Sequence, residues 1–154
     1  MTVSFLESKT IQVNGVDVVI TQLSGLDRYN YMDFCSDLPE PDRPIKPELD
    51  ASEDDKENYL KGMSKYVQKW QRLNFIAKAR LVAYGYRNGV DNIDDRHNEI
   101  MSIMTPEKVA ELYKEIAAFS GIPLEDETST SENTSSETTT TTDSATQEPT
   151  DPKV

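Results

Sequence analysis

The feature that most constrains this chain is a long proline-free stretch between Ser52 and Pro106. In its first part, residues 53–88, apolar side chains recur every three to four positions, which predicts an amphipathic helix. They stand at 60, 63, 67, 70, 77, 81 and 84, widened by 66, 73, 76 and 83. A stripe this wide favours a helix of a bundle over a coiled-coil seam. Ser52 is a typical helix start and Asn88-Gly89 a typical end, while Gly62 and Asn74 leave open whether there is one helix or two.

Two faces of this predicted helix differ in chemistry. Trp70, Leu73, Ile76, Ala77, Leu81 and Tyr84 are expected in the core of a small helical body. Lys61, Lys65, Lys69 and Arg72 fall on one ridge with no acidic partner expected in the helix, and we call them the basic ridge. The whole chain has a formal net charge of −12. The basic ridge is therefore either a solvated face or a docking surface for an acidic partner, another subunit or the tail.

The N-terminal residues predict a β-hairpin. Residues 10–13 alternate polar and apolar, residues 16–20 are rich in β-branched side chains, and Asn14-Gly15 between them suits a type I′ turn. An isolated hairpin is marginally stable in water, so it must pack on the helices or on another copy. Val16 and Val18 are accordingly candidate protein-binding residues, together with the basic ridge.

A first helix is predicted from Ser24, whose hydroxyl and Asp27 can form a capping box, to about Asp37. Its apolar residues Leu26, Tyr29, Met32 and Cys35 recur every three positions, and Tyr31, Phe34 and Leu38 widen the stripe. We expect this stripe to face the core. Four prolines within residues 39–52 then forbid regular helix and predict an extended linker.

Two more helices follow the central one. A short helix is predicted from about Asp94, and Thr105-Pro106 marks the start of the last helix, which Gly121 closes. The last helix carries an acidic ridge of Glu107, Glu111 and Glu115, a candidate complement to the basic ridge within or between subunits.

The C-terminal residues 123–154 have a different composition. They contain 15 Ser/Thr residues and eight acids against one base, with almost no apolar side chains. Such a segment cannot bury enough apolar surface to offset its chain entropy, so we predict a disordered acidic tail. The predicted organisation is a domain at 1–122 and a tail at 123–154. The predicted fold class is mainly α (α+β), a β-hairpin packed on a small helical bundle.

No motif points to catalysis. There is one cysteine, Cys35, and one histidine, His97, and Asp91, Asp94 and Asp95 lack the glycine that an EF-hand loop needs. We therefore expect a protein that is not an enzyme and has no metal or cofactor. No apolar run is long enough to span a bilayer and no signal peptide is recognisable, so we expect a soluble cytoplasmic protein.

Two kinds of binding remain. Nucleic acid could lie along the basic segment 56–87, with Tyr66, Trp70 and Tyr84 stacking on bases. Against this, the helix needs Trp70 for its core, and a net charge of −12 repels phosphate. Protein binding is the preferred interpretation.

The order of these elements resembles the minor tail protein G type of tail assembly chaperone in lambda-like long-tailed phages. The resemblance rests on Asn14-Gly15-Val16, on residues 23–28 opening the first helix, on residues 75–84, and on 111–113 with 118–122 before an acidic C-terminus. The linker at 39–52 and the Thr-rich tail depart from that pattern.

This resemblance implies a specific role. Such proteins bind the tape measure protein in the host cytoplasm during infection and are absent from the mature virion. A longer form made by ribosomal frameshifting recruits the major tail protein. The resemblance also implies a tail that tethers the two activities. From the marginal hairpin and the basic ridge we expect a homo-oligomer, with no membrane partner and no nucleic-acid partner.

Overall fold

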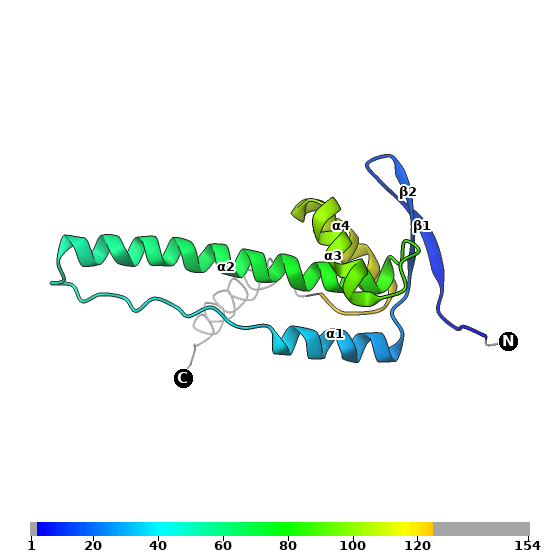
Figure 1. Ribbon diagram of the computed structural model, residues 1–154, viewed down its shortest axis with the longest axis horizontal. Coiled ribbons are helices and arrows are strands. Elements are labelled where there is room, and N and C mark those ends of the chain that lie inside the picture. Colours follow the sequence, from blue (N-terminus) through cyan, green and yellow to red (C-terminus); the bar gives the residue numbers. More distant parts are fainter. Residues whose placement is uncertain (1–2, 125–154) are drawn as a thin grey trace, which may run out of the picture. The chain divides into compact units, whose positions relative to one another are not determined.

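The computed structural model describes residues 3–124, so the predicted disordered tail, apart from its first two residues, lies outside the described part. An antiparallel hairpin is followed by four helices (Figure 1). The strands are β1 (Ser8–Val13) and β2 (Val16–Thr21), and the helices are α1 (Gly25–Asp37), α2 (Glu53–Gly85), α3 (Ile93–Ile103) and α4 (Pro106–Phe119). The predicted fold class, a β-hairpin on a small helical bundle, is confirmed.

The hairpin turns at the predicted dipeptide. Asn14 and Gly15 have φ angles of 54° and 76°, the left-handed values that a type I′ turn requires, and Val13 pairs with Val16 across it. Val13 and Ile20 are buried on the side of the hairpin that meets the helices. The hairpin therefore packs on the helices of its own chain.

The predicted helix starts are confirmed by their capping bonds. The hydroxyls of Ser24, Ser52 and Thr105 accept hydrogen bonds from backbone N–H groups three residues on, and Ser24 forms the full capping box with Asp27. Such a cap satisfies a backbone donor that the first turn of a helix leaves unpaired. The central segment is one helix, since α2 continues through Gly62 and Asn74 and ends at Gly85.

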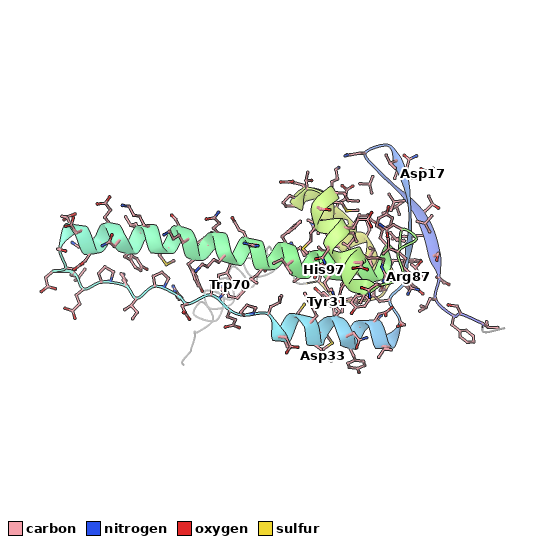
Figure 2. All side chains as sticks on the ribbon, viewed as in Figure 1. Asp17, Tyr31, Asp33, Trp70, Arg87 and His97 are labelled. Atoms are coloured by element: carbon pink, nitrogen blue, oxygen red, sulfur yellow. The ribbon has the colours of Figure 1, made fainter. Side chains whose placement is uncertain are left out.

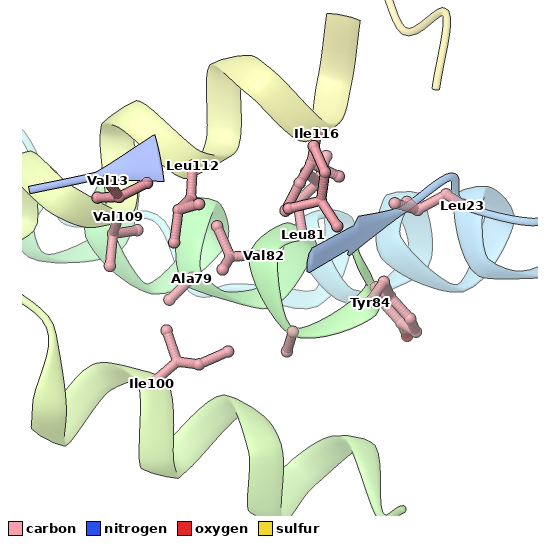
Figure 3. Packing of buried hydrophobic residues seen from close by; sticks show 12 residues of the cluster. Val13, Leu23, Ala79, Leu81, Val82, Tyr84, Ile100, Val109, Leu112 and Ile116 are labelled. Atoms are coloured by element: carbon pink, nitrogen blue, oxygen red, sulfur yellow. The ribbon is translucent and has the colours of Figure 1, made fainter. Parts of the chain in front are cut away.

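The core lies where the last turns of α2 meet α3, α4 and the hairpin (Figure 3). The buried residues of α2 all lie between Ala79 and Gly85. The fully buried large side chains are Ile20, Leu81, Val82, Ile100, Val109, Leu112 and Ile116. Burial of such side chains is the main favourable term in folding, so this end of α2 anchors the bundle.

One glycine sets how closely α2 and α4 approach. A Cβ atom placed on Gly85 would lie 2.4 Å from Cγ2 of Ile116 and 2.9 Å from its Cδ1. Real Cβ atoms do not approach other carbons so closely, so glycine is required for this helix contact.

The predicted core face of α1 is wrong for three of its residues and right for Tyr31, Phe34, Cys35 and Leu38. Leu26, Tyr29 and Met32 are 71%, 68% and 57% exposed, and α1 has no buried residue. A repeat of three falls short of the 3.6 residues of a helical turn, so it drifts around the helix. The face toward the body carries Arg28, Tyr31, Phe34, Cys35 and Leu38, all half-buried, and Arg28 donates to the carbonyl oxygen of Ser120.

The predicted core face of α2 is right only at its C-terminal end. Leu81 and Tyr84 are buried, whereas Trp70, Leu73, Ile76 and Ala77 are half-buried. The reason is that α3 and α4 reach only the last part of α2, and the residues before it have fewer neighbours to cover them (Figure 1).

Candidate protein-binding surface

The N-terminal part of α2 forms an arm, which we define as residues 53–72 together with the linker 39–52. No residue of the arm is buried, and the linker runs alongside the helix in the opposite direction (Figure 1). A Cβ atom on Gly62 would lie 3.3 Å from Cγ of Pro44, which shows that the linker packs directly on α2. Ile45 and Leu49 of the linker are 91% and 94% exposed. The arm therefore offers a large solvent-facing surface held on one side by prolines.

The basic ridge lies on this arm, and all four of its side chains are exposed. The expectation that the helix supplies no acidic partner is wrong for one of them, since Nζ of Lys61 lies 3.6 Å from Oε1 of Glu57 one turn earlier. For Lys65, Lys69 and Arg72, no ion pair occurs within residues 3–124. Three cations thus remain available on a ridge that rises about 16 Å along the helix.

The acidic ridge of α4 forms no ion pair with the basic ridge within residues 3–124. Glu107, Glu111 and Glu115 are exposed, and the one ion pair recorded for them in the described residues is Lys108–Glu111 at 3.5 Å. A meeting of the two ridges between subunits stays a prediction.

The structure separates the two candidate valines from the basic ridge. Val16 is 61% exposed beside the hairpin turn, while Val18 is half-buried and packs against the core cluster. The hairpin lies at the core end of α2, and the arm extends from the other end (Figure 1). The six candidate residues therefore do not form one continuous site within a single chain.

The aromatic side chains of the basic segment are poorly placed for stacking on bases. Tyr84 is buried in the core. Tyr66 and Trp70 are half-buried and pack edge to face, with ring centroids 6.3 Å apart. Trp70 also borders a hollow that Cys35 and Leu38 line from the α1 side. Figure 2 shows Trp70 between α2 and the linker that follows α1.

A cluster around Arg80 joins three helices and was not predicted. Its guanidinium stacks over the ring of Phe34 from α1 at 4.5 Å and donates through NH1 to Oδ1 of Asp94 from α3 at 2.7 Å. His97 lies beside it, edge to face with Phe34 at 5.3 Å and with Nε2 2.9 Å from the carbonyl oxygen of Ile76. Burial lowers the pKa of His97, so the ring stays neutral and Nε2–H donates to that carbonyl.

Arg96 of α3 is a second unpredicted structural residue. Although it is charged, its side chain is buried. Its Nε donates to the carbonyl oxygen of Ala83 at 2.8 Å, and its NH1 donates to those of Val90 and Asp91 at 2.7 and 2.9 Å. These bonds hold the α2–α3 loop and explain how the charge is tolerated in the interior. In the sequence, both arginines look like any other surface cation.

Cys35 and His97 do not form a hydrogen-bonded dyad in the described residues. Cys35 contacts Tyr31, and burial raises the pKa of its thiol. Within residues 3–124 no three His, Cys, Asp or Glu side chains come together as a metal site, and none of the four helices is sufficiently long and apolar to cross a bilayer. The surface features that remain are the arm and the exposed face of α1.

Comparison with known families gives one match. The family model described as bacteriophage lambda tail assembly chaperone, TAC, protein G, matches residues 4–139. No curated protein and no solved structure matches the chain.

Proposed function

The chain belongs to the family of bacteriophage lambda tail assembly chaperones, and from that membership we propose that it binds the tape measure protein during phage tail assembly. Such a chaperone acts in the host cell while tails are being built. We place the binding on the arm and assign the first contact to the basic ridge.

The observation that carries this proposal is the exposure of the basic ridge. Three of its cations have no ionic partner in the described residues, although the chain carries a net charge of −12. Cations concentrated on one exposed ridge attract acidic segments and orient them, more than they add affinity. A long helical partner with acidic residues could run along such a ridge.

The remaining parts of the proposal follow from the family. The chain works without catalysis or a cofactor, in the host cytoplasm, as a homo-oligomer that is absent from the finished virion. Recruitment of the major tail protein takes place through a longer, frameshifted form, with residues 123–154 as the tether.

The test compares two double charge reversals that change the net charge equally. Lys65→Glu/Lys69→Glu alters the basic ridge, and Lys9→Glu/Lys114→Glu alters two exposed lysines outside the arm. Each variant is co-expressed with the tape measure protein of the same phage, and the co-purified amount is measured. We expect the ridge variant to bind about tenfold more weakly or worse, as loss of an important interface contact does, while the control binds normally.

Equal binding by both variants would reduce the basic ridge to a solvated face. A failure of the unaltered chain to bind the tape measure protein would remove the proposed function itself. We do not propose nucleic-acid binding, because Tyr84 is buried and Tyr66 and Trp70 pack against each other instead of standing free to stack on bases.

A further inference from the structure

A groove lies between α2 and the start of α4, next to the basic ridge. Its volume is about 630 Å³. Phe75, Val109, Ala110 and Pro106 supply its apolar lining. Arg72, the last residue of the basic ridge, and Lys78 supply two cations against one acid, Glu107. Gln68, Gln71 and Asn74 complete the lining, so the groove is partly apolar and carries a net positive charge.

The exposed face of α1 has the opposite character. Leu26, Tyr29 and Met32 form an apolar stripe that spans about 9 Å of the helix. Asp33 and Asp37 are exposed beside it, and neither forms an ion pair within residues 3–124. Figure 2 shows Asp33 on the side of α1 that faces away from α2. We call these five residues the α1 face.

We propose that the α1 face of one copy docks into the α2–α4 groove of a second copy. Leu26, Tyr29 and Met32 spread over one broad exposed side of α1, where their apolar side chains can contact the apolar part of the groove lining. The acids of the α1 face then meet Arg72 and Lys78, so the charges are complementary.

The two surfaces cannot meet within one chain. The inner side of α1 meets the C-terminal end of α4, where Arg28 donates to the carbonyl oxygen of Ser120. The groove lies at the start of α4, and the apolar stripe of α1 is exposed to solvent. The contact is therefore head to tail, and each added copy presents a new groove or a new α1 face. Contacts of this kind close into rings or continue as open helical assemblies. This interface rests on the proposed function, because it is the contact through which the proposed homo-oligomer would form.

Two variants block the two surfaces separately. Ala110→Trp fills the groove, and Ala118→Trp is its control at an exposed position on the same helix. Leu26→Glu/Met32→Glu places charge on the apolar stripe, and Ile103→Glu on α3 is the control at a comparably exposed residue. Sedimentation velocity over a range of protein concentrations measures self-association.

We expect the unaltered chain and both controls to associate with rising concentration. The groove variant and the stripe variant should each associate about tenfold more weakly or worse. A mixture of the two variants should form a heterodimer that grows no further, because it contains one intact groove and one intact α1 face.

Three results would overturn the inference: a monomeric unaltered chain, blocked variants that associate normally, or a mixture that forms no heterodimer. If Ala110→Trp loses the tape measure protein but associates normally, the groove belongs to that partner and the inference is also wrong. The proposed function has a separate readout, since it fails only if the unaltered chain does not bind the tape measure protein.

Discussion

Replacement of Gly85 by alanine tests the packing of α2 on α4. The added methyl group would lie 2.4 Å from Cγ2 of Ile116, so one of the helices or side chains must shift. Overpacking of this kind costs about 1–3 kcal/mol. Alanine also has a better helix propensity than glycine by about 1 kcal/mol, which offsets part of the cost. We expect Gly85→Ala to lower the free energy of unfolding by up to about 2 kcal/mol, measured by urea denaturation.

Gly62→Ala is the matched control, in the same helix but in the arm. There the added methyl group would lie 3.3 Å from Cγ of Pro44, in a linker that can give way. We therefore expect a neutral effect or a gain of up to about 1 kcal/mol from helix propensity.

The double variant Gly85→Ala/Ile116→Ala isolates the contact. Ile116→Ala alone should cost about 2–5 kcal/mol, because it leaves a cavity in the core. In the double variant the new methyl group occupies part of that cavity, so the two effects should fall short of additivity by at least about 1 kcal/mol. Strictly additive effects would show that the two side chains do not compete for one space, and the account of the α2–α4 contact would be wrong.

Three further changes probe the interior and the arm. Burial lowers the pKa of His97 in the folded state, so near pH 6.5, the ordinary pKa of histidine, only the unfolded state takes up a proton on this residue. The free energy of unfolding should therefore fall as the pH drops below about 6.5. His97→Gln should weaken this dependence, measured by urea denaturation at several pH values. Arg96→Met should cost about 3 kcal/mol or more in urea denaturation, because it leaves three carbonyl oxygens without their donor. Arg43→Met, at an exposed position of the linker, should have little effect. Lys61→Ala should change thermal stability by less than about 0.5 kcal/mol, because its pair with Glu57 is exposed; a larger loss would mean that the pair stabilises the arm.

The local features of the fold could be predicted from the sequence because their signals are local. A type I′ turn needs Asn-Gly, and a helix start needs a side-chain acceptor, so Asn14-Gly15, Ser24 and Thr105 fixed those positions. The basic ridge was also predictable, because its spacing alone places its members on one side of the helix.

The choice of core face could not be predicted in the same way. On α1, larger apolar residues such as Leu26 and Met32 are exposed, while Arg28 and Tyr31 face the body. Tertiary contacts decide which side of a weakly amphipathic helix is covered, and the sequence of the helix does not contain them. The roles of Arg80 and Arg96 likewise depend on carbonyl oxygens and rings that only the fold brings near.

The linker beside α2 gives the arm a defined length. The helix rises about 14 Å from Glu53 to Gly62 at ~1.5 Å per residue, and the linker covers the same distance between Pro44 and Ser52. Because Pro44 contacts α2 at Gly62, the linker and the helix are held side by side in antiparallel directions. Each residue removed from this part of the linker would thus have to be matched by about one residue of helix. The number of residues between Pro39 and Ser52 therefore limits the length of the arm. It would also limit the spacing that the arm imposes between successive copies or partners.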